Sequence, residues 1–291
     1  MGNFTFSRIR LEYKAITDFK QPYFLGSAIR GVLGRRLKKI VCIKINEECK
    51  NCEFNKTCPY TVVFETELYL NQPSKYVMIP EYEEKEVKKG NSIYVDITLL
   101  GNTLEYWQFI IEALRTTINL GKGRLIKHEN NFYYHPFEEK YFPIKSFIPK
   151  FEAKDFFSLN IDNNHMILKL YPTSLRFKGK YVLAREFNKD FFVKALVSRI
   201  SNVAKNYGNK NDKIFIDKTK FEIEKKEFKP FPMIRWSNRK KRKMKIPAFT
   251  GYLKLTGDLQ EIYPYIKIAE NINIGKATSL GLGRLKIVEM E

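Results

Sequence analysis

The sequence of 291 residues has no apolar run that approaches the roughly 18 residues needed to cross a bilayer. Its N-terminus lacks the apolar core of a secretory signal peptide. Phe6 stands where a myristoylation motif would have serine or threonine. These absences predict a soluble, cytoplasmic protein that does not contact a membrane.

Catalytic motifs and acidic residues are also scarce. The sequence has no serine nucleophile elbow, no H-E-x-x-H helix and no cluster of carboxylates, which leaves acyl-transfer and metal-hydrolase chemistry without support. Its three histidines, His128, His135 and His165, are interpreted as structural. Only 32 acidic residues oppose 52 basic ones, and the net charge of +20 favours polyanionic partners such as nucleic acid.

A glycine-rich stretch at 274–285 (IGKATSLGLGRL) organises the rest of the chain. Gly275, Gly281 and Gly283 permit positive φ and close approach of the backbone to a ligand. Lys276 and Arg284 add positive charge, a combination typical of phosphate-binding loops. The stretch matches neither the Walker pattern nor a G-x-G-x-x-G that opens a helix, so a tight connection without a ligand is the alternative.

A shortened copy of this stretch, LGKGRL, occupies residues 120–125. A predicted strand at 94–100 and a helix at 104–118 precede the first copy, and a strand at 249–255 and a helix at 259–268 precede the second. The order strand, helix, glycine turn, strand therefore occurs twice, about 155 residues apart, which indicates duplicated domains. Chance similarity of short units is the alternative.

The remaining elements complete the same order in each half. Strands are predicted at 4–13, 61–70 and 165–172, and helices at 22–39 and 189–207. The predicted fold class is α+β, with two tandem ferredoxin-like (RRM-like, β-α-β-β-α-β) domains. The N-terminal domain spans 1–135 with a cysteine-cluster insertion at about 42–60, a linker spans 136–164, and the C-terminal domain spans 165–291 with its glycine-rich loop at 275–283.

All four cysteines lie within 17 residues, at Cys42, Cys49, Cys52 and Cys58. The two-residue spacing of Cys49 and Cys52 allows two thiolates to bind one tetrahedral metal ion from a tight turn. An intracellular compartment disfavours disulfides. A structural Zn²⁺ site with four thiolates is the preferred interpretation. An iron–sulfur cluster and four unligated thiols are the alternatives, since the flanking spacings are irregular.

Two segments concentrate basic side chains. Residues 235–245 (RWSNRKKRKMK) contain seven basic residues among eleven and no acidic one, which predicts a projecting hairpin. We expect RNA contacts from this hairpin, although a solvated loop is the alternative. The helix at 22–39 carries a second basic face that includes Arg30 and Arg35. This face is expected to contact phosphate, and a solvated surface is again the alternative. The hairpin residues expected to contact RNA are Arg235, Trp236, Arg239, Lys241, Arg242 and Lys243.

The chain resembles the CRISPR repeat-processing endoribonucleases of the RAMP superfamily, and specifically their cysteine-cluster subgroup. Four segments carry the resemblance, and they follow the family's order across both halves. They are 25–34 (LGSAIRGVLG), the cysteine group ending at 58–60 (CPY) and followed by 64–65 (FE), 235–240 (RWSNRK), and the glycine-rich residues 275–276 with 281–284.

The resemblance implies cleavage without a metal ion, in which the 2′-OH attacks the adjacent phosphate and leaves 2′,3′-cyclic phosphate and 5′-OH ends. Such chemistry needs a base, an acid and cations for the phosphorane charge. Relatives often have histidine two residues before the terminal Gly-Lys, where this chain has Asn273, and the first helix has no histidine either. Lys276 and Arg30 are therefore the expected charge stabilisers, and Tyr23 is the candidate for proton transfer.

Two functions from different classes follow from this resemblance. The first is a metal-independent endoribonuclease that binds CRISPR repeat RNA, with the RNA also contacting Arg35, Gly275, Gly281, Gly283 and Arg284. The second is a non-cleaving RNA-binding subunit of a CRISPR effector complex, which Asn273 favours. A zinc-containing DNA-binding regulator is a third class, but the sequence has no helix-turn-helix. The sequence leaves open whether the protein is a monomer or a homodimer.

Overall fold

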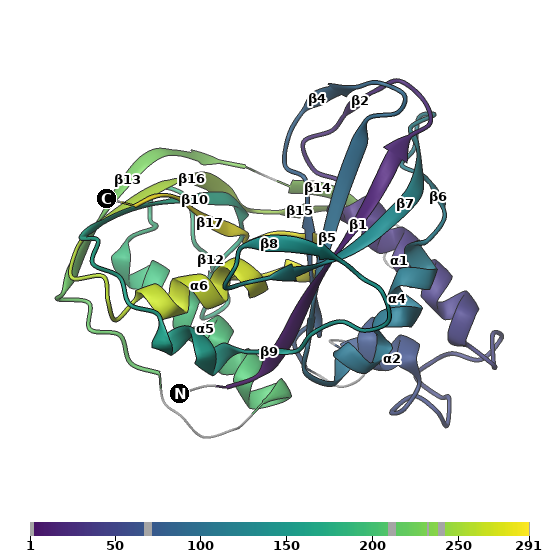
Figure 1. The fold of residues 1–291 in the computed structure, drawn as a ribbon, viewed down its shortest axis with the longest axis horizontal. Helices are drawn as coiled ribbons and strands as arrows, with labels where there is room; N and C mark the ends of the chain where they lie inside the picture. Colours follow the sequence, from purple (N-terminus) through teal and green to yellow (C-terminus); the bar gives the residue numbers. More distant parts are fainter. Residues whose placement is uncertain (1–2, 67–71, 209–213, 232, 238–241, 291) are drawn as a thin grey trace. The chain divides into compact units, whose positions relative to one another are not determined.

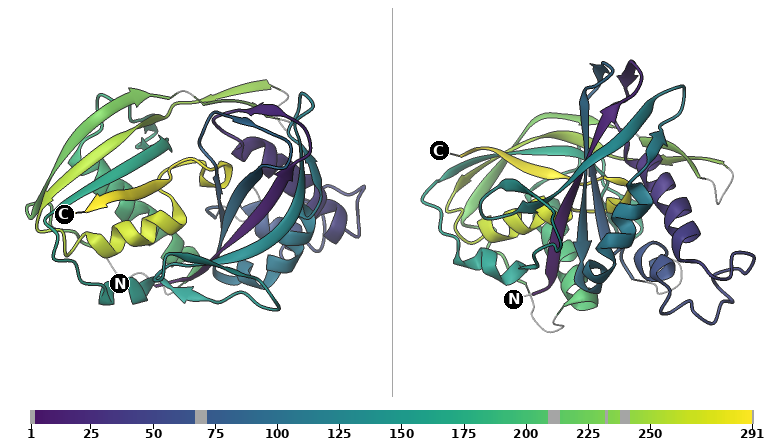
Figure 2. Two further views of the ribbon diagram at one scale, coloured as in Figure 1. Left: turned by 45° about the horizontal axis from the view of Figure 1, so that its top comes forward. Right: turned by 45° about the vertical axis from the view of Figure 1, so that its right-hand side comes forward.

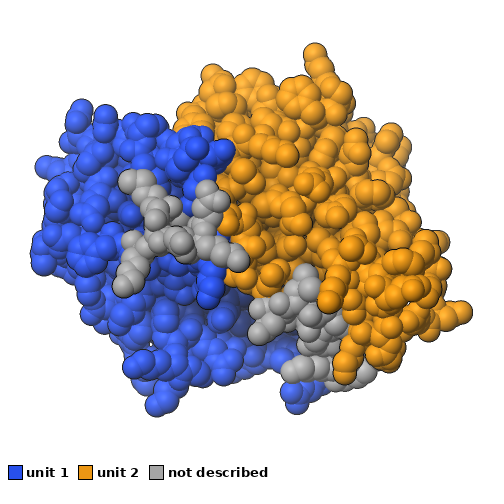
Figure 3. All heavy atoms as spheres, turned by 90° about the horizontal axis from the view of Figure 1, so that it is seen from below, with its two compact units in different colours: residues 1–3, 152–205, 209–291 blue, residues 4–151, 206–208 orange. Residues whose placement is uncertain are grey.

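A computed structural model describes residues 3–66, 72–208, 214–231, 233–237 and 242–290. The chain forms two compact units, coloured separately in Figure 3. The N-terminal unit comprises residues 4–151 with 206–208, and the C-terminal unit comprises residues 1–3, 152–205 and 209–291.

The N-terminal unit is built on a sheet with the order β3-β5-β1-β7, to which the short strand β6 is added beside β7. Its main strands are β1 (Thr5–Ala15), β3 (Tyr76–Pro80), β5 (Ser92–Leu100), β6 (Thr117–Asn119) and β7 (Leu125–His135). Helices α1 (Gly26–Val41) and α4 (Trp107–Leu114) pack on one face of the sheet, and a 3-10 turn, η1 (Gly101–Tyr106), leads into α4. Strand β1 lies between β5 and β7, and β3 pairs with the other side of β5, as in a ferredoxin-like domain.

The C-terminal unit repeats this topology with the order β13-β16-β10-β17. Its strands are β10 (His165–Thr173), β13 (Phe221–Pro230), β16 (Phe249–Gly257) and β17 (Leu285–Met290). Helices α5 (Lys189–Tyr207) and α6 (Tyr263–Ile272) lie on one face of this sheet (Figures 1 and 2). The predicted α+β class with two ferredoxin-like units is confirmed by the two matching strand orders.

Three short two-stranded sheets complete the fold. They are formed by β2 (Phe19–Gln21) with β4 (Lys85–Val87), β11 (Arg176–Phe177) with β12 (Lys180–Tyr181), and β14 (Met233–Ser237) with β15 (Arg242–Ile246). The last of these confirms that the basic segment at 235–245 lies on a hairpin, within the described residues. No helix in the described parts of the chain is long and apolar enough to cross a membrane.

The element expected as a strand at 61–70 is the largest error of the sequence prediction. Residues Pro59–Val63 form a helix, α2, and residues 67–70 lie outside the described structure. Pro59 occupies the first turn, where its missing N–H costs no hydrogen bond. The apolar residues that suggested a strand instead pack on α1, where Phe64 fills the space over Gly34. Tertiary packing therefore outweighs the β-propensity of the valines.

Helix boundaries also differ from the prediction. The helix expected at 22–39 begins at Gly26, because the chain before it is extended in β2, which pairs with β4. The helix expected at 104–118 ends at Leu114, and the following residues pair with β7 as strand β6. The helix expected at 259–268 runs from Tyr263 to Ile272, with Pro264 in its first turn.

Residues 136–164, expected as a linker, contain regular structure. Strand β8 (Lys140–Pro143) pairs with β7 and extends the N-terminal sheet, and β9 (Phe151–Glu152) pairs with β1. A 3-10 turn, η2 (Ala153–Ser158), follows and packs on α6. Pro143 is the last residue of β8, and Pro136 and Pro149 lie between strands. These prolines do not mark a free linker, because an edge strand tolerates proline at its ends.

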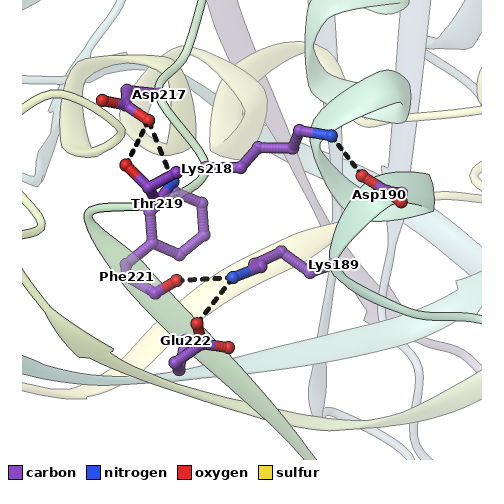
Figure 4. Close-up of polar contacts among 7 residues, drawn as sticks. All are labelled: Lys189, Asp190, Asp217, Lys218, Thr219, Phe221 and Glu222. Carbon is purple, nitrogen blue, oxygen red and sulfur yellow. Dashed lines mark hydrogen bonds and ion pairs between the residues drawn. The ribbon is translucent and has the colours of Figure 1, made fainter.

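Polar contacts fix the start of α5 against the edge of the C-terminal sheet (Figure 4). Lys189 Nζ donates to the carbonyl oxygen of Phe221 at 2.9 Å and to the carboxylate of Glu222 at 2.8 Å. Lys218 pairs with Asp190, and Asp217 accepts hydrogen bonds from the amide and hydroxyl of Thr219. These contacts order the connection between helix and edge strand.

Alanine substitutions at two glycines of α1 test how tightly Phe64 packs on this helix. A Cβ added at Gly34 would lie 2.2 Å from Cζ of Phe64, whereas a Cβ at Gly31 would meet only Arg35 Nη1 at 3.6 Å. We expect Gly34→Ala to lower the free energy of unfolding by about 2 kcal/mol through overpacking. The matched change Gly31→Ala should raise it by about 0.5–1 kcal/mol through helix propensity. Urea denaturation of both variants measures this, and equal stabilities would contradict the packing.

Candidate nucleic-acid interface

The glycine-rich loop joins α6 to β17 through a series of left-handed backbone conformations. Positive φ angles occur at Asn273 (55°), Gly275 (77°), Ala277 (60°), Gly281 (99°) and Gly283 (81°). The short 3-10 turn η3 (Thr278–Leu280) lies in the middle of the loop. The three glycines therefore occupy positions that an L-residue adopts only with strain.

The two ends of this loop touch. A Cβ on Gly283 would lie 1.7 Å from the carbonyl oxygen of Ile274, and one on Gly275 would lie 2.3 Å from the carbonyl oxygen of Ser174. The Ile274 amide donates to the Gly283 carbonyl at 2.8 Å. Glycine is thus required here by close backbone contacts within the protein.

The loop does not present its amides as an open cradle. The amide of Lys276 donates to Ser174, that of Gly283 to Pro172, and those of Leu280, Gly281 and Leu282 to carbonyls within the loop. What the loop offers at its surface is the side chain of Lys276, which is exposed. The sequence analysis expected the backbone of this loop to approach a ligand closely. The structure instead shows a rigid turn that carries an exposed cation.

Asn273 is a buried part of this turn. Its side chain is fully buried, and Nδ2 donates to the carbonyl oxygen of Leu282 at 3.0 Å, across the loop. Its φ of 55° and ψ of 168° lie in a backbone region that glycine adopts more readily than other residues. Asn273 therefore stabilises the loop from the inside.

Two side chains that the sequence analysis missed also support the loop. Arg199 of α5 is buried and donates from Nε and Nη2 to the carbonyl oxygen of Ile272, at 3.2 and 3.1 Å, where α6 ends. Glu270 accepts the amide of Ile287 in β17 and pairs with Lys267 at 3.0 Å. Arg199 stands at the buried-face spacing of its helix, between Leu196 and Val203, and this spacing was the available signal.

The basic hairpin is partly described. Trp236 pairs with Lys243 and Ser237 with Arg242 in the ladder between β14 and β15. The side chains of Arg242 and Lys243 are exposed, and that of Arg235 is half-buried. Arg239 and Lys241 lie outside the described residues. The described part thus presents exposed cations on a two-stranded ribbon.

The candidate residues of the first helix belong to the N-terminal unit. The guanidinium of Arg30 lies 4.4 Å from the centre of the Phe64 ring, and this stacking holds its side chain half-buried. Arg35 is exposed. Tyr23 precedes α1, with its ring 6.5 Å from that of Tyr82 in an edge-on arrangement. Arg30 therefore has a packing role in addition to any contact with phosphate.

Two histidines make polar contacts inside the N-terminal unit. His128 Nε2 lies 2.8 Å from Oδ1 of Asn131, and His135 Nε2 lies 3.5 Å from the carboxylate of Glu138. His165 is half-buried at the start of β10 in the other unit. The interpretation of all three as structural stays a prediction.

The four cysteines lie between α1 and α2, and all are half-buried. Cys42 follows the last residue of α1, and Cys58 precedes the first residue of α2. Burial raises the pKa of the Cys49 thiol, Lys38 lowers it, and Cys42 and Cys58 raise it again. Three of the four thiols are therefore near enough to interact electrostatically.

In the described residues, however, no three His, Cys, Asp or Glu side chains are arranged to hold a metal ion. The donor types suit Zn²⁺, but this arrangement of them does not form a tetrahedral site. The proposal of a structural zinc therefore rests on the sequence spacing and on the proximity of the thiols.

Family and structure comparisons agree with these features. A family model described as the CRISPR-associated endoribonuclease Cas6 matches residues 168–285, from the first strand of the C-terminal unit through the glycine-rich loop. A second family model, described as an N-terminal domain, matches residues 4–137. An uncharacterized protein of Archaeoglobus fulgidus is 27% identical over 116 residues, which covers 38% of this chain and 40% of that relative. The match thus spans less than half of the relative's length.

Solved structures share the fold over nearly the whole chain. A Cas6 product complex has a TM-score of 0.54 at 11% identity and covers 98% of this chain and 100% of its own. A Cas6-related protein from Pyrococcus furiosus has a TM-score of 0.50 at 14% identity, covering 98% of this chain and 99% of its own. A Cas6-RT-Cas1–Cas2 complex has a TM-score of 0.59 at 12% identity, covering 99% of this chain and 29% of that one.

The chain shares its two ferredoxin-like units with the solved Cas6 structures. The resemblance to the CRISPR repeat-processing endoribonucleases of the RAMP superfamily is confirmed, and the Cas6 match includes the glycine-rich loop. At these identities the solved structures show the fold, and the Cas6 family model gives the link to the family in sequence.

The buried position of Asn273 predicts a stability effect. Asn273→Ala removes the buried hydrogen bond to Leu282 and leaves that carbonyl without its donor, so we expect a loss of about 2 kcal/mol in the free energy of unfolding. Asn273→Gly should lose only about 1 kcal/mol, because glycine adopts this φ without strain. Urea denaturation compares the variants, and unchanged stability in both would mean that Asn273 does not hold the loop.

The zinc proposal predicts about one zinc ion per chain in protein prepared without chelator, because four thiolates complete one tetrahedral site. Cys52→Ser should lower the melting temperature, since structural zinc contributes folding free energy, while RNA binding persists. Elemental analysis and thermal unfolding provide the measurements. Protein that contains neither zinc nor iron would rule out a metal at these cysteines.

Proposed function

We propose that this chain binds CRISPR repeat RNA and cleaves it to produce guide RNAs. The observation that carries the proposal is the Cas6 match over residues 168–285, which includes Lys276 and the glycine-rich loop. The net charge of +20 supports a polyanionic partner. The match itself supports a role in CRISPR-associated RNA processing, and the mechanism below is our inference.

The proposed reaction is an intramolecular phosphoryl transfer. A base takes the proton of the 2′-OH, the 2′-oxygen forms a bond to the adjacent phosphorus, and the bond from phosphorus to the 5′-oxygen breaks. An acid protonates the leaving 5′-oxygen, so the products carry 2′,3′-cyclic phosphate and 5′-OH ends. We infer that this reaction proceeds without a metal ion, as it does in the family that the chain resembles.

Lys276 is the proposed stabiliser of the charge on the phosphorane. Its backbone is held by the bond from its amide to Ser174, and its side chain is exposed. A cation on a rigid turn needs little reorganisation when charge develops, which is the condition for electrostatic stabilisation of a transition state. Arg30 is the second proposed cation, and Tyr23 is the proposed proton-transfer group.

A second function has one observation in its favour. Asn273 occupies the position where relatives often have histidine. Its side chain is buried and donates a hydrogen bond to the carbonyl oxygen of Leu282. An asparagine in this position cannot move a proton, so the chain would lack that general base. In this alternative the protein is a non-cleaving RNA-binding subunit of a CRISPR effector complex.

Incubation of the protein with a labelled repeat RNA in EDTA tests the proposal. We expect slow cleavage that leaves a cyclic phosphate, detected by end-group analysis. Lys276→Ala should reduce the rate roughly 10²-fold or more, because one preorganised charge is lost. Lys180→Ala, which removes an exposed lysine of the short strand β12, is the matched control and should cut at the parental rate.

The outcomes separate the two functions. Tight binding of the repeat without cleavage at any pH would replace the endoribonuclease with the effector subunit. Equal reductions of the cleavage rate in Lys276→Ala and Lys180→Ala would show that the net positive charge of the protein governs the rate, and not the position of Lys276 in the loop.

A further inference from the structure

The C-terminal sheet has one face that α5 and α6 do not cover (Figures 1 and 2). Along β10, Met166, Leu168 and Leu170 are buried toward the helices, while Lys169 and Tyr171 point the other way and are half-exposed. On β16, Leu253 and Leu255 are buried and Tyr252 and Lys254 alternate with them, also half-exposed. The open face therefore carries lysine and tyrosine on its two central strands.

These side chains form one connected group. Lys169 pairs directly with Tyr252 across the ladder of β10 and β16. Its Nζ lies 5.0 Å from the centre of the Tyr171 ring and 5.6 Å from that of Tyr252. The guanidinium of Arg284, which follows the glycine-rich loop, lies 4.8 Å from the Tyr171 ring. Two aromatic rings are thus held together with two cations at cation–π distances.

The charge of the face is mainly positive. The ladders place further lysines beside the group, and three carboxylates lie on the same face, of which Glu222 pairs with Lys189 (Figure 4). The cations are Lys169, Lys226, Lys254, Arg284 and Lys286, and the other two carboxylates are Glu224 and Glu289. A flat surface that combines rings with excess positive charge suits a ligand with both π-faces and phosphates.

The N-terminal sheet provides an internal contrast. Arg10 also lies over two rings, at 4.9 Å from Tyr94 and 3.5 Å from Tyr141, but Asp96 binds its guanidinium at 2.6 and 3.0 Å. Asp96 is buried and also accepts the hydroxyl of Tyr141 at 2.5 Å. Burial and Asp96 together raise the pKa of Tyr141, so this phenol stays protonated. A carboxylate neutralises the cation there, and that group is built for internal structure.

We propose that the open face of the C-terminal sheet, centred on Tyr171, Tyr252 and Lys169, is a stacking platform for unpaired bases of single-stranded RNA. This inference rests on the proposed RNA-binding function and adds a second contact surface beside the glycine-rich loop. Unpaired bases expose π-faces that stack on aromatic rings or on guanidinium planes, and their phosphates meet the surrounding lysines. Bases within a duplex are already stacked on one another, so the platform selects single strands.

Arg284 links this platform to the loop. Its carbonyl accepts the amide of Tyr171 at 3.0 Å, and the next residue toward the loop is Gly283. A strand of RNA that stacks on Tyr171 therefore lies beside the segment that carries Lys276. The platform would hold single-stranded RNA that adjoins the bound repeat.

The test measures binding of the full-length protein to two fluorescent RNAs by anisotropy. One probe is an unstructured ten-nucleotide oligouridine, and the other is the repeat RNA. We expect Tyr252→Ala and Tyr171→Ala each to weaken oligouridine binding roughly 10-fold, the order of one lost stacking contact. Tyr252→Phe should retain the parental affinity, because the ring that stacks is preserved, and this variant separates stacking from folding.

Tyr181→Ala is the matched control. Tyr181 is 39% exposed, and the guanidinium of Arg176 lies 5.5 Å from its ring, but it belongs to the β11–β12 hairpin. This change should leave oligouridine binding at the parental level. A second readout uses 2-aminopurine in place of one uridine, whose fluorescence should be quenched on binding to the parent and less so to Tyr252→Ala.

Each result decides the proposal. Oligouridine affinity that is unchanged in both alanine variants, or lost equally in Tyr181→Ala, would overturn the platform while repeat binding still stands. If the parent binds neither RNA, the proposed function itself fails. A 10-fold loss confined to Tyr171→Ala and Tyr252→Ala, with Tyr252→Phe intact, would establish the platform.

Discussion

The close approach of Ile274 and Gly283 is the constraint on which the C-terminal unit depends. The carbonyl oxygen of Ile274 occupies the space where a Cβ at position 283 would lie, so the two ends of the loop meet as bare backbone. Asn273 and Arg199 then hold the end of α6 in place, one from inside the loop and one from α5. The loop is consequently a rigid part of the domain, and Lys276 projects from a fixed base.

This rigidity changes how the glycine-rich motif is understood. Such motifs are often read as flexible cradles whose amides point at a ligand. Here the glycines serve contacts within the protein, and most of the loop's described amides donate to protein carbonyls. The positive charge of Lys276, and not the backbone, is what remains for a phosphate.

The two units share a topology but differ in the chemistry of their sheets. In the N-terminal unit, the carboxylate of Asp96 pairs with the guanidinium of Arg10, which also stacks on the ring of Tyr141 from β8. In the C-terminal unit, Lys169 and Arg284 lie against tyrosines on a face where basic residues outnumber acidic ones. A duplicated fold thus supports one internally paired face and one suited to an external polyanion, which agrees with the principle that function lies in sites and not in folds.

The sequence alone determined the features that depend on local periodicity. The strands β10 and β17, the helix α5 and the hairpin of β14 and β15 follow from alternation, helical spacing and charge repulsion, and the doubled β-α-β order follows from the repeat of the glycine turn. The candidate cations Lys276 and Arg30 were also visible, because residue type and motif suffice to nominate a cation. The cysteine cluster was nominated by spacing alone.

Only the tertiary structure decided how those residues are used. It made a helix of Pro59–Val63, because Phe64 packs over Gly34, a contact between residues 30 positions apart. It buried Asn273 against Leu282 and Arg199 against the end of α6. It also brought Lys169 of β10, Tyr252 of β16 and Arg284, which precedes β17, onto one face. Burial and cross-strand register depend on contacts between distant segments, and no local pattern in the sequence carries that information.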